Sequence, residues 1–221
     1  MLLLSIDIGM KNLAHCLLRV EDTMQIVDWD VVDLTECPKC QKCVKAAAYR
    51  TSHGAYCKKH VPVVNASLKS DMEDACKTHG IAVGSRTEMA AALAVFKKKE
   101  TVKAKTTVEL GRALAEAYAR FPNVDVVLVE NQMATRMAVV QGMVIQYWVM
   151  RGAPTIEVVS PTNKLKVLAA GKTTYAERKK LSIERTRTLL DEMKLATSFE
   201  THKKKDDLAD TFLQAVWYLK R

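Results

Sequence analysis

The sequence lacks any long hydrophobic run. No stretch of its 221 residues approaches the roughly 20 consecutive apolar residues that cross a bilayer. The N-terminal apolar run ends at Asp7 with no cationic leader before it. Internal repeats and low-complexity tracts are also absent. We therefore expect no membrane span and no secretion, and instead an intracellular globular protein of one domain, or of one domain with a small insert, whose 48% hydrophobic content can form a full core.

Acidic residues are too few to balance the basic ones. The chain carries 34 Lys and Arg against 25 Asp and Glu, a net charge of +9. A basic surface attracts phosphates and releases their counterions, so a polyanion such as nucleic acid is the favoured partner. The alternative is a basic surface that serves only solubility.

An α/β pattern surrounds a segment of different composition. Three alternating runs at the N-terminus predict a β-meander, and later apolar runs predict two buried strands and four helices. The expected strands span 2–8, 13–20, 24–34, 124–130 and 155–160, and the expected helices span 106–121, 133–152, 175–194 and a last one from Lys205. Residues 37–104 lack a strand-like apolar run, which predicts an insertion between core segments 1–36 and 105–221.

Four cysteines crowd into the start of the insertion. Cys40-x-x-Cys43 and Cys57-x-x-His60, thirteen residues apart, have the ligand types and spacing of a closed structural zinc site. Cys37 also forms C-x-x-C with Cys40, so the ligand register could shift, and unliganded thiols are the other alternative. Without export signals, metal ligation is favoured over disulfides, which predicts a reducing compartment. Zinc would stabilise the zinc knuckle (37–62), a segment too small for its own core.

Four carboxylates occupy places where they can meet. Asp7 and Glu130 close buried strands, and Asp207 and Asp210 share a face of the last helix, away from its apolar stripe. Ligands bind at such strand ends in open α/β sheets. Taken singly, each acid is better explained as a solvated strand end or an ordinary acid at a helix N-terminus. As a set, they predict a site for two Mg²⁺ or Mn²⁺ ions that hydrolyses phosphodiesters. Asp206 is an alternative to Asp207.

Four ordered motifs carry a resemblance to a known family. D-I-G-M-K-N after the first strand, L-V-E-N-Q, Y-A-E-R-K-K and K-K-D-D-L-A-D resemble the RuvC-type Holliday-junction resolvases, particularly those of poxviruses, other large DNA viruses and fungal mitochondria. The resemblance covers about residues 1–35 and 105–221. It implies an RNase H-like fold, with a mixed five-stranded sheet and helices on both faces, a homodimer, and paired nicks in four-way DNA junctions. It also implies that Asp7, Glu130, Asp207 and Asp210 are the catalytic metal ligands.

The resemblance further implies a basic residue near the scissile phosphate. Within Y-A-E-R-K-K we favour Lys179 as the catalytic cation, and Arg178 and Lys180 as phosphate contacts. Lys164 and Lys166 are weaker DNA-binding candidates. The alternative for each is a charge on a solvated helix.

The second part of the insertion, 66–98, reads as helix, extended turn and helix. It resembles the SAP DNA-binding motif, and a plain helical hairpin is the alternative.

The sequence thus predicts a metal-dependent endonuclease that resolves branched DNA, acting at a viral replication site, in the cytoplasm or nucleus, or in a mitochondrion. Two alternatives stay open: an RNase H-like nuclease for flaps, R-loops or RNA–DNA hybrids, and a non-catalytic, zinc-containing nucleic-acid-binding protein.

Overall fold

Apolar strands build the central sheet of the computed structural model, which describes residues 1–221 except 52–53, 62–68, 95–99, 102–103 and 169–173. Its strands lie in the order β3-β2-β1-β7-β8. They are β1 (Leu2–Asp7), β2 (Leu13–Val20), β3 (Met24–Val32), β7 (Val126–Glu130) and β8 (Thr155–Val159). The first three form an antiparallel meander, and β7 and β8 run parallel to β1. This mixed five-stranded sheet confirms the predicted fold class.

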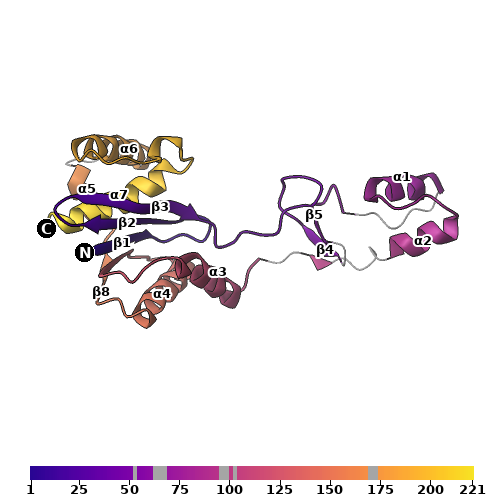
Figure 1. Cartoon of the computed structure of the whole chain (residues 1–221), viewed down its shortest axis with the longest axis horizontal. Coiled ribbons are helices and arrows are strands. Elements are labelled where there is room, and N and C mark those ends of the chain that lie inside the picture. The colour runs from indigo at the N-terminus through magenta and orange to yellow at the C-terminus, as the bar shows by residue number, and fades with distance from the viewer. Residues whose placement is uncertain (52–53, 62–68, 95–99, 102–103, 169–173) are drawn as a thin grey trace. The chain divides into compact units, whose positions relative to one another are not determined.

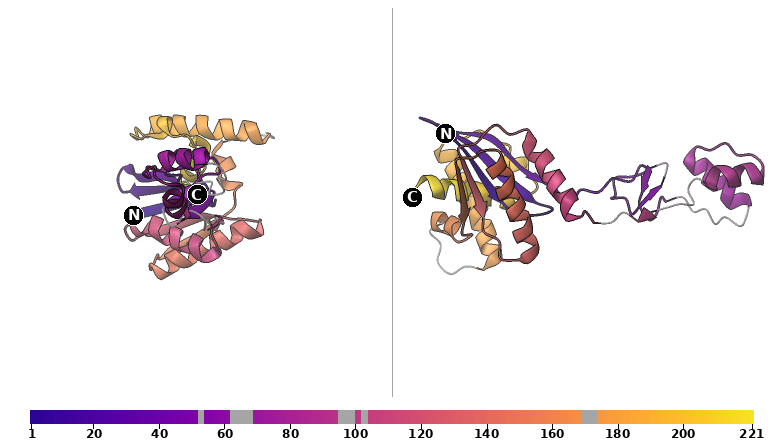
Figure 2. Two further views of the ribbon diagram at one scale, coloured as in Figure 1. Left: turned by 90° about the vertical axis from the view of Figure 1, so that its right-hand side faces the viewer. Right: turned by 90° about the horizontal axis from the view of Figure 1, so that it is seen from below.

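Helices cover both faces of this sheet (Figure 1; Figure 2). On one face lie α3 (Thr107–Ala119) and α4 (Thr135–Met150), and on the other lie α5 (Asn163–Leu168), α6 (Tyr175–Glu192), a 3-10 turn (Phe199–Thr201) and α7 (Lys205–Leu219). Because successive strand side chains point to opposite faces, Leu4 packs against α3 and α4 while its neighbour Leu3 packs against α7. The buried strands therefore have apolar residues on both sides, as their continuous apolar runs predict.

One expected core strand is less buried than the sequence predicts, and one apolar helix is buried on one side only. β8 is an edge strand in which only Val159 is buried. Helix α4 is buried along one face only, through Val140, Val144 and Trp148. Its other face exposes apolar side chains, including Val139, which is 47% exposed, and Val149, which is 53% exposed.

The chain divides into two units: residues Met1–Thr35 with Lys105–Arg221, and residues Glu36–Ala104. The second unit contains a small antiparallel sheet of β4 (Tyr49–Thr51), β5 (Gly54–Tyr56) and β6 (Glu100–Thr101). These strands have three residues or fewer, which is too short for a strand-like apolar run to show in the sequence. Helices α1 (Lys69–His79) and α2 (Arg86–Ala94) pack through Met72, Cys76, Met89 and Leu93. Their order is that of the hairpin expected at 66–98, of which 66–68 and 95–98 lie outside the described residues.

None of the helices in the described ranges is long and apolar enough to span a membrane.

Candidate active site and metal centre

Asp7 and Glu130 end adjacent parallel strands. β1 and β7 pair with Ile6 opposite Val129, so the next residue of each strand is one of the two acids. The chain turns sharply after Asp7, where a Cβ on Gly9 would lie 2.3 Å from the Asn12 carbonyl oxygen. Glycine is therefore required in this turn. The two carboxylates meet because both strands end at the same edge of the sheet.

Helix α7 brings Asp210 to that edge. One turn after Asp210, the buried Gln214 side chain donates hydrogen bonds from its Nε2 to Ser5 Oγ (3.1 Å) and to the carbonyl oxygens of Ile6 (3.4 Å) and Leu128 (3.5 Å). At the start of α7, Trp29 Nε1 donates to the Leu208 carbonyl oxygen at 3.1 Å. These bonds fix the helix against β1, β7 and β3. Gln214 is a positioning residue that the sequence reasoning missed, although a Gln next to the apolar stripe of α7 was a visible signal.

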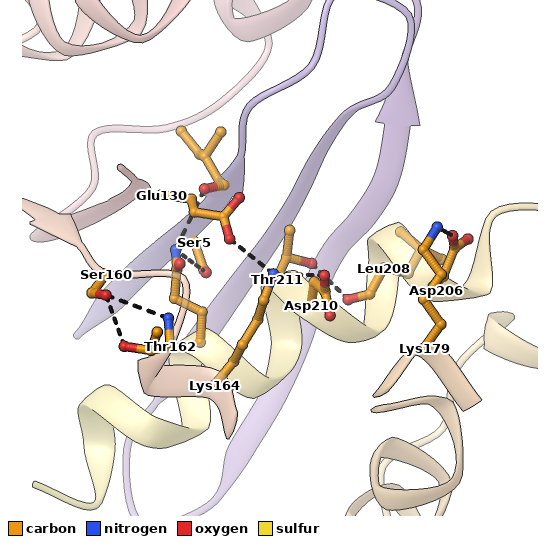
Figure 3. A network of polar contacts seen from close by, with 12 residues as sticks. Ser5, Glu130, Ser160, Thr162, Lys164, Lys179, Asp206, Leu208, Asp210 and Thr211 are labelled. Atoms are coloured by element: carbon orange, nitrogen blue, oxygen red, sulfur yellow. Dashed lines mark hydrogen bonds and ion pairs between the residues drawn. The ribbon is translucent and has the colours of Figure 1, made fainter. Parts of the chain in front are cut away.

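Lys164 lies at the centre of the acidic cluster (Figure 3). Its Nζ donates to Glu130 Oε1 at 2.8 Å and to Asp210 Oδ2 at 2.6 Å, and its side chain is only 15% exposed. Burial alone would lower the pKa of Lys164, but the charges of Asp210, Glu130 and Asp7 outweigh burial and raise it. The sequence suggested Lys164 only as a phosphate contact, and the structure instead places its ammonium between two predicted metal ligands.

Burial and mutual repulsion perturb the carboxylates. Burial, with the hydrogen bond and charge of Glu130, raises the pKa of Asp7 well above its usual value. Burial also raises the pKa of Asp210, partly offset by Lys164. Burial would raise the pKa of Glu130 too, but Asp7 and Lys164 contribute hydrogen bonds and charge that hold it below its usual value. Because Lys164 supplies one positive charge to three acids, the cluster has the electrostatics of a cation site.

Asp206 and Asp207 lie one turn earlier on α7. Asp206 Oδ2 accepts a hydrogen bond from Lys179 Nζ at 2.5 Å, away from the Lys164 cluster (Figure 3). Asp207 Oδ2 lies 4.0 Å from Lys204 Nζ, and burial together with the Asp206 charge raises its pKa. The structure thus joins Asp7, Glu130 and Asp210 around Lys164 and gives Asp206 a separate partner. Asp207 stays a proposed ligand.

The other predicted DNA contacts lie outside the acidic cluster. Lys179 also contacts the Tyr175 ring, 5.0 Å from its centroid. Lys180 is an exposed side chain 4.0 Å from Glu184, and Lys166 lies 5.8 Å from the centroid of the Trp217 ring. Arg178 is partly buried, and its Nε has no hydrogen-bond partner among the described residues.

Three cysteines and a histidine gather in the insertion. The ligand atoms of Cys40, Cys43, Cys57 and His60 all lie within 4.8 Å of one another, and no other group of three or more His, Cys, Asp or Glu in the described ranges is as tight. Cys40 Sγ lies 3.6 Å from His60 Nδ1, and Cys43 Sγ lies 3.9 Å from Cys57 Sγ. Cys37 is not in this group. The arrangement matches the predicted register of two ligand pairs.

Local hydrogen bonds shape both ligand turns. The Cys43 N–H donates to the Cys40 carbonyl, and the His60 N–H donates to the Cys57 carbonyl, at 3.3 and 3.1 Å. Burial would raise the pKa of the Cys40 thiol, but backbone N–H groups of Cys57 and Lys42 and contact with His60 lower it to about 6. A thiol that ionises this readily is prepared to bind a metal, since the thiolate is the ligand.

The fold and the acidic cluster define the class of this protein: an RNase H-like α/β protein with carboxylates at the carboxyl ends of its central strands. A family model described as Poxvirus A22 protein matches residues 80–221. Because that match covers more than half of the chain, the protein belongs to the poxvirus A22 protein family. The matched range includes Glu130, Lys164 and Asp210, and it begins after the cysteine–histidine group. No curated protein sequence matches the chain.

Solved structures share the fold at low sequence identity. The fowlpox virus resolvase in complex with Holliday junction DNA aligns with a TM-score of 0.55 and 16% identity, over 100% of this chain and 97% of that one. The yeast mitochondrial Holliday junction resolvase Ydc2 aligns with a TM-score of 0.50 and 19% identity, over 99% of this chain and 78% of that one. Thermus thermophilus RuvC aligns with a TM-score of 0.50 and 14% identity, over 100% of this chain and 96% of that one. These relatives agree with the resemblance that the motifs indicate.

Proposed function

We propose that this protein is a metal-dependent endonuclease that resolves four-way DNA junctions by paired nicks. The observation that carries the proposal is the convergence of Asp7, Glu130 and Asp210 around one buried cation at the carboxyl ends of β1 and β7. Family membership and the resolvases among the structural relatives support the choice of a junction over other nucleic acids. The net charge of +9 favours such a polyanion.

The acidic cluster is chemically suited to Mg²⁺ or Mn²⁺. Asp7, Glu130 and Asp210, with Asp207, would hold one or two ions, because hard cations prefer carboxylate oxygens and Lys164 already shows that a cation is stabilised there. Bound ions would activate water and stabilise the leaving oxygen.

The protein's own residues would supply position and charge. Gln214 would hold Asp210 in register with the strand ends, and Lys164 would favour the ionised forms of Glu130 and Asp210. Lys179, held by Asp206, would face the phosphate from α6, as the family resemblance implies.

The exposed face of α4 would form a homodimer contact. Val139, Val149 and the 79% exposed Met150 present apolar surface there. An apolar helix face that no described part of the chain covers is suited to self-association, and a dimer can place two acidic clusters on one symmetric junction. A Val149→Asp substitution should shift the protein toward monomers in light scattering.

The cysteine–histidine group would hold one structural Zn²⁺. Three sulfur atoms and one nitrogen complete a tetrahedral site, so no position is left for a catalytic water. Phosphodiester hydrolysis therefore falls to the carboxylates.

A cleavage assay tests the nuclease proposal. We expect the full chain with Mg²⁺ to nick a synthetic four-way junction in pairs, and Asp7→Asn and Glu130→Gln to lower the rate at least about 10³-fold while junction binding persists. Asp22→Asn is the matched control. Asp22 is an exposed acid in the turn between β2 and β3, and this turn lies at the opposite end of β1 from Asp7.

Flap, RNA–DNA hybrid and linear duplex substrates of the same sequence complete the assay. Preference for the flap or hybrid would replace the junction with another substrate. Binding without cleavage of any substrate, or full activity of Asp7→Asn, would contradict the proposal.

A further inference from the structure

The positive charge of the insertion is concentrated around its metal ligands. Residues 36–61 contain six basic residues and one acid, Glu36, an excess of five positive charges in a chain whose net charge is +9. The basic residues are Lys39, Lys42, Lys45, Arg50, Lys58 and Lys59. All six are exposed. Three thiolates with Zn²⁺ add one negative charge, so most of this excess would persist at the surface.

The two helices of the hairpin, within their described residues 69–94, have the opposite balance. Residues 69–94 contain three basic residues, Lys69, Lys77 and Arg86, and four acids, Asp71, Glu73, Asp74 and Glu88. Two of its bases already face acids on the same helix, with Lys69 3.8 Å from Glu73 and Lys77 4.0 Å from Asp74. A net negative pair of helices is poorly suited to contact phosphates. The SAP-like resemblance, made for 66–98, also takes in Lys97 and Lys98, which lie outside the described residues. With them the balance is five bases to four acids, so the knuckle still carries the larger positive excess.

The metal ligands place the lysines of the knuckle on two adjoining turns. Lys42 lies inside the first turn, between Cys40 and Cys43, and the Lys45 carbonyl closes that turn by accepting a 2.8 Å hydrogen bond from the Cys40 N–H. Lys58 and Lys59 lie inside the second turn, between Cys57 and His60. Because the four ligand atoms lie within 4.8 Å of one another, the two turns are held together.

Several of these lysines are available to a partner. Lys42 Nζ donates to the Thr78 carbonyl at 3.0 Å, and Lys39 lies 3.6 Å from Glu36. Across the described part of the chain, Lys45, Lys58 and Lys59 form no ion pair with a carboxylate. Exposed, unpaired lysines gain most from phosphate contact because they give up no existing interaction.

We infer that the metal-bound knuckle, rather than the helical hairpin, is the part of the insertion that grips the DNA backbone. The inference rests on the proposed function for its substrate, a junction whose arms extend beyond the acidic cluster. The partner is a nucleic acid read through its phosphates, so the contact is independent of base sequence. The metal acts here by fixing where Lys45, Lys58 and Lys59 stand.

Two triple variants of the full chain, matched in charge, test the inference. One carries Lys45→Gln, Lys58→Gln and Lys59→Gln, and the other carries Lys69→Gln, Lys77→Gln and Arg86→Gln. Binding to a fluorescent four-way junction is measured with Ca²⁺ in place of Mg²⁺ over a range of salt. We expect the knuckle variant to bind about tenfold more weakly, with a plot of log affinity against log salt that is less steep by about 2 to 3. The hairpin variant should bind like the unmodified protein.

Two controls separate charge from folding. Zinc content per chain shows whether the knuckle variant keeps its metal, and Lys45→Arg, Lys58→Arg and Lys59→Arg together should restore affinity because they keep the charge. If the triple variant loses zinc, the single variant Lys45→Glu tests the inference instead, because Lys45 lies outside both ligand pairs. It should also weaken junction binding and flatten the salt dependence.

The outcomes distinguish this inference from the nuclease proposal. Unchanged affinity of the knuckle variant, or an equal loss in both triple variants, would overturn the assignment even if the unmodified protein cleaves junctions. A loss confined to the knuckle variant would support it even if the protein cleaves none.

Discussion

The two units of this protein reach order by different means. The nuclease-like core has a five-stranded sheet with a large apolar cluster on each face, and it holds three buried or partly buried acids and a lysine at one edge. The described residues of the insertion form two small clusters, one of which consists of Cys40 and Cys57, two of the proposed metal ligands, with Tyr56 and Val61. A large core can support unfavourable buried charge, whereas a small segment needs ligand bonds to fold.

The two proposed metal sites differ in chemistry in the same way. In the core, hard oxygen atoms surround a cation that the protein supplies itself, Lys164. In the insertion, three soft sulfur atoms and one imidazole nitrogen lie within 4.8 Å of one another. The first arrangement favours exchangeable ions and catalysis, and the second favours one tightly held structural ion.

Removing zinc should have the largest effect on stability, and that effect should be confined to the insertion. We expect Cys57→Ser to lose the metal and unfold residues 36–61, because zinc binding supplies on the order of 10 kcal/mol to such sites, while the core melts at an unchanged temperature. Metal analysis and hydrogen exchange measure this. Cys37→Ser is the matched control and should keep one zinc. Loss of zinc from Cys37→Ser, or a full zinc in Cys57→Ser, would refute the ligand assignment.

Removing the internal cation should destabilise the core instead. Lys164→Met leaves the buried Glu130 and the partly buried Asp210 without their partner, so we expect the free energy of unfolding in Mg²⁺-free buffer to fall by about 3 kcal/mol. Added Mg²⁺ should restore part of the loss. Lys166→Met is the control, because Lys166 is an exposed residue of α5 two positions further on. It should lower the free energy of unfolding by less than about 1 kcal/mol. Urea denaturation of both variants measures the difference. Equal stabilities would show that Lys164 does not hold the cluster together.

Removing an acid from the same cluster should stabilise the folded core rather than destabilise it. Burial and Glu130 raise the pKa of Asp7, so its ionised form destabilises the folded state. We expect Asp7→Asn to abolish cleavage yet raise the melting temperature in Mg²⁺-free buffer by about 2–4 °C. A carboxyl whose pKa is raised by folding does not destabilise the folded state at a pH below its unfolded pKa of about 3.9. The destabilisation grows as the pH rises from that value toward the pKa of the folded state. The gain should therefore vanish in acid. A lower melting temperature at neutral pH would contradict this account.

The sequence predicts most of the core because its signals are local. The apolar run before Asp7 and the stripe of α7 from Lys205 onward have periods that fix their type, and the parallel placement of β1 and β7 follows from the family pattern. The strands of the insertion could not be found this way, since β6 has only two residues. Metal-ligand spacing was the better guide there, because it is a chemical signal that needs no periodicity.

The bridge formed by Lys164 could not be predicted, because it depends on where α5 lies over the strand ends. A long flexible side chain can reach solvent or a buried carboxylate, and only tertiary structure selects between them. Gln214 is a similar case: its polarity is visible in the sequence, but its partners Ser5 and Leu128 are far away in the chain. The charge balance of the knuckle and hairpin, in contrast, is fully readable from sequence once their boundaries are known.

The smallest effect should come from the Asp206 pair at the border of the cluster. Burial would raise the pKa of Asp206, but Lys179 outweighs it and lowers that pKa. Since Lys179 is 42% exposed, Asp206→Asn should cost well under about 1 kcal/mol. Cleavage should change less than about threefold, whereas Asp207→Asn, with the same loss of charge one residue along, should lower it about 100-fold if Asp207 is the ligand. Single-turnover cleavage of the junction compares the two. The reverse order would assign the ligand to Asp206 and leave Lys179 without a role beyond that pair.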